Sequence, residues 1–183
     1  ELKSEGLAGN FYPFYGKHYS NGMIIGGQFI PKEYYQVWKT KKKNRFISLK
    51  FNNKKLIFFE IKPNEHRDPK INLFKLENPK DPVSAALELI IINNEKLIQN
   101  IFDGRRTYSM SVVEKEILKS KKLNLGEKIK KYELVVSNYQ NVWKDHNDTD
   151  LRKVIIETVE LENNIIIPLS FKIYNKGLGR IYA

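Results

Sequence analysis

The chain has 183 residues, of which 41% are hydrophobic and 12% aromatic, so its length and composition fit one globular domain with its own core. The absence of cysteine excludes disulfides, thiolate metal sites and a cysteine nucleophile. The net charge of +11 comes mostly from lysine, and because arginine supplies the bidentate contacts that base recognition favours, we attribute this charge to compositional bias rather than to nucleic-acid binding.

Apolar runs in this sequence are too short to cross a membrane as a helix. The densest run, Leu87–Ile92, has about a third of the ~18 residues that a spanning helix needs. The chain also opens without the basic start and apolar segment of a signal peptide. Because its first residue is Glu1 rather than Met, the sequence is compatible with an export signal that has been removed.

Aromatic side chains gather in the first forty residues. They are interpreted first as ordinary core and strand packing, and alternatively as the lining of an apolar groove or barrel mouth that meets a ligand. The candidate groove aromatics are Phe11, Tyr12, Phe14, Tyr35 and Trp38. The glycine-bearing segments 9–16 and 21–27 are interpreted as turns, since neither joins a strand to a helix as phosphate-binding loops do.

Alternating patterns predict a strand over Lys32–Lys43 and then a hairpin. The hairpin strands are Asn44–Phe51 and Leu56–Ile61, and Asn52–Asn53 between them suits a tight turn because asparagine tolerates the left-handed backbone. The proline-containing region that follows is expected to be a loop with a short strand at Ile71–Leu76.

Residues 81–92 carry the one strong helix pattern of the sequence. Asp81 is a good N-cap, and Pro82 suits the first helical position, where its missing N–H costs nothing. Apolar residues at helical spacing predict a single apolar face. They are Val83, Ala86, Leu87, Ile90 and Ile91.

Strand patterns resume after the helix and continue to the end of the chain. A strand leads to a turn at Asp103–Gly104, and a second hairpin turns at Glu162–Asn164. Alternation in the strands between them predicts two rows of side chains, each on one face of its strand. These rows are Tyr108, Met110 and Val112, and Tyr132, Leu134 and Val136. The fold is therefore predicted to be mainly β (α+β), an antiparallel β protein with one embedded helix in a single domain over residues 1–183.

No metal site, cofactor site or catalytic motif is predicted. His18, His66 and His146 lie far apart, and none has a second metal-type ligand at helix or hairpin spacing. The acidic segment around His146 lacks the glycine and distal glutamate of a calcium-binding loop, so it is interpreted as a solvated loop. Paired carboxylates for an enzyme would have to come together from distant positions.

The segments KDPVSAALEL and FDGRRTYSMSV form a spaced pair of motifs. Their characteristic residues are Asp81, Pro82, Ser84, Ala85, Asp103, Gly104, Arg105, Arg106 and Tyr108. This pair resembles the family of exported bacterial proteins known as domain of unknown function 3108, whose members carry Asp-Pro-x-Ser-Ala at a helix start and Asp-Gly-(Lys/Arg)-Arg-x-Tyr at a later turn and strand. Shorter matches near both ends extend the resemblance over nearly the whole chain.

The resemblance implies an exported, periplasmic protein whose antiparallel sheet curves around the helix as a half-barrel, similar to the periplasmic carriers of lipoproteins and lipids. Members usually begin with one or two more strands, so this chain is expected to start inside the domain. Many also carry a Trp and paired aspartates before the final hairpin turn, where this sequence has Thr158–Asn164. No role is therefore carried over to those positions.

The two arginines after Asp103–Gly104 are open to two interpretations. As successive strand residues, Arg105 and Arg106 are expected to point to opposite faces of the sheet. An inward arginine needs a carboxylate partner, and we expect Asp81 to be that partner, which would lock the helix onto the sheet. The alternative is an arginine that grips an anionic headgroup or an acidic glycan at the mouth of a groove.

The function expected from these observations is non-enzymatic binding of a hydrophobic or amphiphilic ligand, in an apolar cavity that faces the helix. A protein–protein module of envelope assembly, using a sheet edge or a basic face, is the first alternative. An enzyme acting on envelope polysaccharide is the second alternative. Binding of nucleic acid ranks last.

Overall fold

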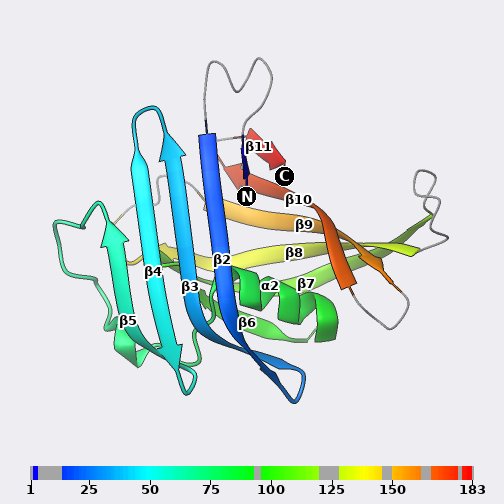
Figure 1. Ribbon diagram of the computed structural model, residues 1–183, viewed down its shortest axis with the longest axis horizontal. Coiled ribbons are helices and arrows are strands. Elements are labelled where there is room, and N and C mark those ends of the chain that lie inside the picture. Colours follow the sequence, from blue (N-terminus) through cyan, green and yellow to red (C-terminus); the bar gives the residue numbers. More distant parts are fainter. Residues whose placement is uncertain are drawn as a thin grey trace.

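Antiparallel hairpins account for most of this fold, and an α-helix lies between two sheets (Figure 1). The computed structural model describes residues 2–3, 14–92, 96–119, 128–145, 150–161, 166–176 and 179–182. Within these ranges the chain is mainly β with one α-helix, which confirms the predicted fold class, and the strands form two open sheets that do not close into a barrel.

The first sheet is built from neighbouring segments of the chain, in the strand order β1-β2-β3-β4-β5. Its strands are β1 (Leu2–Lys3), β2 (Phe14–Ile25), β3 (Gln28–Thr40), β4 (Asn44–Asn52) and β5 (Lys55–Lys62). Gly26 and Gly27 turn between β2 and β3 with positive φ angles, so only the end of the segment 21–27 is a turn and the rest is strand. The β4–β5 turn lies at Asn53 and Lys54, one residue later than predicted.

The second sheet contains the C-terminal part of the chain, in the order β11-β10-β9-β8-β7-β6. Its strands are β6 (Ile98–Phe102), β7 (Arg106–Lys119), β8 (Lys128–Asn141), β9 (Asp150–Glu160), β10 (Ile166–Lys176) and β11 (Gly179–Tyr182). The predicted alternation of Tyr108, Met110 and Val112 is confirmed, since all three side chains are buried on one face. The predicted turn at 162–164 lies outside the described residues.

The connection between the sheets carries a short 3-10 helix, η1 (Leu73–Lys75), and the α-helix α2 (Pro82–Ile92). The short strand predicted at Ile71–Leu76 is wrong. The side-chain oxygen of Asn72 accepts a hydrogen bond from the Phe74 N–H at 3.1 Å, which caps a helical turn there instead. No helix in the described ranges is long and apolar enough to span a bilayer.

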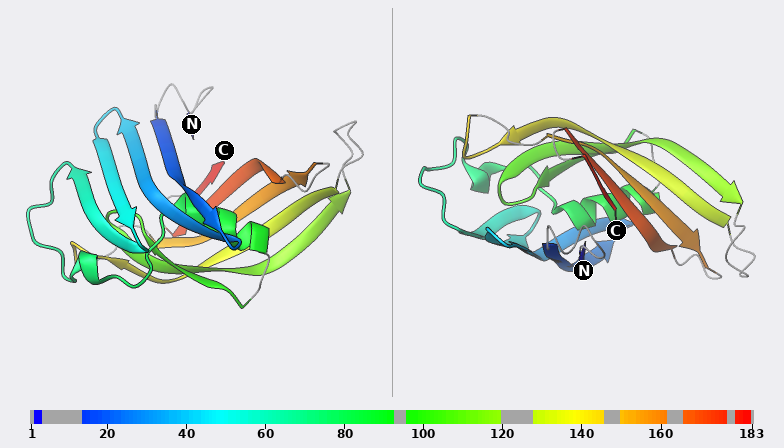
Figure 2. Two further views of the ribbon diagram at one scale, coloured as in Figure 1. Left: turned by 60° about the horizontal axis from the view of Figure 1, so that its bottom comes forward. Right: turned by 90° about the horizontal axis from the view of Figure 1, so that it is seen from above.

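Helix α2 is buried from two sides, because the first sheet covers one side and the second sheet covers the other (Figure 2). Its buried residues are Ser84, Ala85, Glu88, Leu89 and Ile90. The predicted apolar face is therefore wrong in part: Ile91 is exposed, whereas the polar Ser84 and Glu88 are buried. A helix between two sheets has two interior faces, and a single apolar stripe does not describe it.

Two apolar clusters form the core. The first cluster lines the first sheet, but it includes Phe102, Val142 and Trp143, which the second half of the chain supplies. The second cluster packs Ala85 and Leu89 of α2 against strands of the second sheet. Both halves of the chain therefore contribute to the interior that surrounds the helix.

Candidate functional site

The start of helix α2 is fixed by Asp81, as its predicted N-cap role requires. Its Oδ1 accepts hydrogen bonds from the backbone N–H groups of Val83 and Ser84, both at 3.0 Å. Its Oδ2 accepts from Ser20 Oγ of β2 at 3.0 Å, and Ser20 also lies 3.0 Å from Ser84 Oγ. Burial raises the pKa of Asp81, and these hydrogen bonds oppose that shift. Asp81 and Ser84 thus tie the helix to the first sheet.

The Asp103–Gly104 segment is a tight turn, as predicted. Asp103 Oδ1 accepts from the backbone N–H of Arg105 at 2.8 Å and of Arg106 at 2.7 Å. Gly104 has a φ of +93°, and a Cβ at this position would lie 2.4 Å from Cγ2 of Ile47 in the first sheet. The Gly104 carbonyl accepts from Trp143 Nε1 at 3.2 Å. Only glycine fits this close approach between the two sheets.

The expected pairing of an arginine with Asp81 is wrong, because the carboxylate of Asp81 is bonded to serine and backbone donors. Arg105 instead forms an ion pair with Glu65, and its Nη2 donates to the carbonyl oxygen of Pro63 at 3.1 Å. Burial lowers the pKa of Arg105 to about 10, so it stays charged at neutral pH. Arg105 therefore joins the second sheet to the segment after β5, rather than locking the helix onto a sheet.

Arg106 and Tyr108 follow this turn, in the first residues of β7. An Nη1–Oδ2 distance of 3.8 Å pairs Arg106 with Asp103, and the guanidinium lies 5.6 Å from the ring centroid of Tyr139. Tyr108 is buried against the Tyr139 ring, with 5.4 Å between the centroids. Burial raises the pKa of Tyr108 well above its usual range, so the phenol stays neutral.

The candidate groove aromatics do not form one set in the described structure. Tyr35 packs edge-on against Phe46 with 5.2 Å between ring centroids, on the side of β3 opposite to the buried Tyr34. Trp38 is half-buried and lies on the Tyr34 side by strand alternation. Phe11 and Tyr12 lie outside the described residues, and only the backbone of Phe14 is described, as the start of β2.

A buried polar cluster centred on Glu88 was not predicted from the sequence. Glu88 forms an ion pair with Lys80, and the two side chains are only 3% and 4% exposed. Its carboxylate also accepts from Gln99 Nε2 at 2.7 Å and from the backbone N–H of Phe29 at 2.6 Å. Glu88 thus joins α2 to β6 and to the β2–β3 hairpin.

His18 and Tyr34 form a second buried polar contact near the helix. His18 Nδ1 lies 2.9 Å from the Tyr34 hydroxyl, and burial lowers the pKa of His18. Burial raises the pKa of Tyr34 well above its usual range, and the charges of Asp103 and Asp81 act in the same direction. The carboxylates of both motifs, Asp81 and Asp103, therefore act electrostatically on the same buried phenol.

The two faces of the second sheet differ in chemistry. Cross-strand ion pairs cover one face, where Lys131 bonds Glu116, Lys153 bonds Glu133 and Lys172 bonds Glu157. The opposite face carries the second apolar cluster and helix α2. Several apolar side chains of the helix side remain only half-buried. They are Val136, Tyr139, Leu151, Val154, Ile166 and Phe171.

Two surface hollows lie outside helix α2, although Ile101 and Tyr108 of the second apolar cluster line one of them. One, of about 280 Å³, lies between the segment Leu76–Pro79 and polar residues such as Asn100 and Gln140. The other, of about 480 Å³, lies between the β4–β5 turn and Phe74–Asn78. Neither is lined by α2, so neither is the apolar, helix-facing cavity that the sequence led us to expect.

The carboxylates of the polar clusters described above are paired with nearby donors, whereas the Nε atoms of Arg105 and Arg106 are buried without a hydrogen-bond partner in the described structure. In the described part of the chain, no group of three or more His, Asp or Glu side chains is arranged to hold a metal ion. The motif residues position the turn, the helix start and the two sheets, and several apolar side chains on the helix side of the second sheet stay only half-buried. No protein-family model, curated protein or solved structure matches this chain.

Proposed function

We propose that this protein binds an amphiphilic ligand without catalysis, and that the apolar part of the ligand lies on the helix-facing side of the second sheet. The observation that supports this is the half-buried apolar row on that face, which includes Leu151, Val154 and Phe171. Apolar side chains that line a concave surface and stay partly in water are typical of ligand-binding faces.

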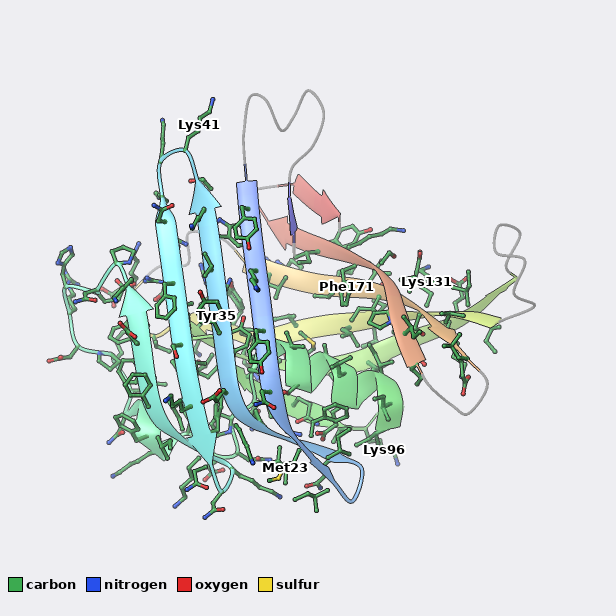
Figure 3. All side chains as sticks on the ribbon, viewed as in Figure 1. Met23, Tyr35, Lys41, Lys96, Lys131 and Phe171 are labelled. Atoms are coloured by element: carbon green, nitrogen blue, oxygen red, sulfur yellow. The ribbon has the colours of Figure 1, made fainter. Side chains whose placement is uncertain are left out.

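The dimensions of the helix explain why this face is not fully covered. Helix α2 has 11 residues, so it is about 16 Å long and about 10 Å wide. Strand β8 has 14 residues and is about 46 Å long, and adjacent strands add about 4.8 Å each to the width. One short helix therefore shields only part of the sheet, and Phe171 lies on β10 to the side of α2 (Figure 3).

The same face has a charged end, which favours an amphiphile over a purely apolar ligand. Lys130 of β8 forms an ion pair with Glu160 of β9, next to the buried Tyr132. By strand alternation, Lys130 and Tyr132 lie on one side of the sheet. A ligand with an acyl chain and a polar headgroup would meet both environments. Exported, periplasmic localisation belongs to the same proposal, and it is supported by the sequence resemblance alone.

Native mass spectrometry tests this proposal. The protein is purified from its own envelope without detergent, and its mass is measured before and after organic extraction. We expect a discrete added mass that extracts as a lipid. A bare mass under these conditions, together with no binding of added fluorescent fatty acid, contradicts the proposal.

A variant pair locates the ligand. We expect Phe171→Ser to weaken the binding of a fluorescent fatty acid about tenfold or more, because it removes a large apolar contact from the proposed face. Phe58→Ser is the matched control, since Phe58 is 42% exposed on β5 of the first sheet. Equal affinity of the two variants would place the ligand elsewhere.

The free edge of the first sheet supports a second candidate function, that of a protein–protein module. In the described strands β5 pairs only with β4, and it exposes Ile57 and Phe58. An open apolar edge strand is a template on which another chain can add a strand. Ile57→Lys would abolish capture of a partner through this edge and leave fatty-acid binding unchanged.

A further inference from the structure

The far end of the β2–β3 hairpin exposes three consecutive apolar side chains. Ile24 is 63% exposed, Ile25 is 56% exposed and Met23 is 43% exposed. Across the hairpin, Met23 pairs with Ile30, Ile24 with Phe29 and Ile25 with Gln28. The tip is therefore regular strand up to the glycine turn. Consecutive exposed apolar residues at a protruding tip have no role in the core, and such patches mark interaction sites.

The hairpin tip is part of a larger apolar end of the molecule. Glu88 of α2 accepts from the Phe29 N–H at 2.6 Å, which holds the hairpin against the last turns of the helix. Those turns expose Ile91 and Ile92, and β6 begins soon after with Ile98, which is 63% exposed. We define the apolar end as Met23, Ile24, Ile25, Ile91, Ile92 and Ile98. Figure 3 labels Met23 and Lys96 at this end of the molecule.

Positive charge borders the apolar end. Lys54 Nζ donates to Gln28 Oε1 at 3.2 Å, so the β4–β5 turn lies beside the base of the hairpin tip. The exposed charged residues of the adjoining described segments are Lys32, Glu33, Lys54, Lys55 and Lys96. Lysine thus exceeds acid around the patch, and the chain as a whole carries +11. An apolar surface with a basic border complements an anionic surface with an apolar interior.

We infer that the apolar end docks on the surface of an anionic lipid bilayer. Three strand residues at about 3.3 Å each reach about 10 Å, which matches the ~5–10 Å depth at which interfacial elements rest between headgroups and acyl chains. The tip of the β2–β3 hairpin projects from the molecule (Figure 1), so it does not form a groove that could enclose a partner segment. The lysines lie beside the tip, where they meet the headgroups as the isoleucines enter the acyl boundary.

Single-cysteine labelling tests the depth and the orientation of this docking. The 183-residue sequence has no cysteine, so Ile24→Cys carries one environment-sensitive fluorophore at the tip. Ile117→Cys is the matched control, because Ile117 is 61% exposed on β7 of the second sheet. With vesicles of phosphatidylglycerol and phosphatidylethanolamine, we expect a blue shift and quenching by nitroxide lipids at position 24, and neither at position 117. Equal signals at both positions overturn the inference.

Vesicle co-sedimentation measures the contribution of the side chains. We expect Ile24→Ser/Ile25→Ser to bind the anionic vesicles at least tenfold more weakly than the wild type, and Ile117→Ser to differ by less than twofold. Lys54→Gln and Lys96→Gln should each weaken binding about fivefold, with less effect at high salt. Bilayer docking is overturned if the wild-type protein does not bind the vesicles. It is also overturned if the double serine variant binds the vesicles normally but loses self-association or a protein partner.

Bilayer docking does not depend on the proposed ligand face, so experiments can contradict either hypothesis without contradicting the other. A protein that binds fatty acid normally but does not bind vesicles retains the proposed function and loses the docking. A protein that docks through Ile24 but shows no lipid in native mass spectrometry keeps the docking and loses the proposed function.

Discussion

Arg105 and Glu65 form an ion pair that joins the two sheets, since Arg105 directly precedes β7 and Glu65 follows β5. The same guanidinium donates to the carbonyl oxygen of Pro63 at 3.1 Å, so it binds both a side chain and the backbone of that segment. Both side chains are mostly buried. The contact therefore positions the sheets around the helix rather than presenting a free cation to a ligand.

Replacing Arg105 with Ala should destabilise the protein by about 2 kcal/mol, because it leaves the carboxylate of Glu65 half-buried and without its partner. The change is measured by urea unfolding. Arg67→Ala is the control, since Arg67 lies 3.9 Å from Asp145 with both side chains largely exposed, and such pairs contribute less than about 1 kcal/mol. Equal midpoints for the two variants would show that Arg105 is not a structural contact.

Gly104→Ala should cost about 2–4 kcal/mol, because it combines a left-handed φ with a methyl group only 2.4 Å from Ile47 Cγ2. Gly26→Ala separates the two effects. Gly26 also has a positive φ, of +57°, but its added Cβ would have no neighbour within 4 Å, so we expect a loss of about 1 kcal/mol. Thermal unfolding of both variants gives the difference, and similar losses would argue against the close approach.

Glu88→Gln should destabilise the protein by about 3 kcal/mol, because Lys80 would stay buried without its counter-ion. Combining this change with Lys80→Met should recover most of the loss, since the glutamine oxygen can still accept from the Phe29 N–H. A double-mutant cycle in urea measures the coupling. Additive losses in the double variant would mean that the ion pair does not act as a unit.

Burial lowers the pKa of His18, so the folded protein favours the neutral imidazole. The stability contributed by His18 is therefore fully present above the unfolded pKa of about 6.5. That contribution is lost as the pH falls through the lower, folded pKa, because the unfolded state binds the proton more readily. Wild-type stability should therefore decrease relative to His18→Asn between pH 7 and pH 5. The comparison isolates His18 from Asp81 and Asp103, whose pKa values are raised by burial and which act in the opposite direction. Parallel pH profiles of the two proteins would contradict this assignment.

Local features of the fold could be predicted from the sequence. The N-cap at Asp81 and the turn at Asp103 depend on hydrogen bonds to residues two or three positions away. Such bonds are encoded in the residue types themselves. The alternation that buries Tyr108 and Met110 is equally local.

The partners of the buried charges could not be predicted in the same way. Glu65 and Arg105 are far apart in the sequence, and Glu88 of α2 accepts from a backbone N–H of β3. Only packing of the two sheets brings these groups together. One signal was available: Gln99 lies between Leu97 and Ile101 on the inward side of its strand, and a polar residue in that position requires a buried partner.

Trp143 follows β8, yet its ring completes the apolar cluster of the first sheet together with Val142 and Phe102. The hairpins β2–β5 are therefore synthesised long before the residues that close their interior. A nascent chain that has emerged only through β5 lacks these side chains, and we expect ordered folding of the first sheet only after synthesis has passed Trp143. Both sheets should then unfold together in one transition, which Trp143 fluorescence can follow in a Trp38→Phe variant.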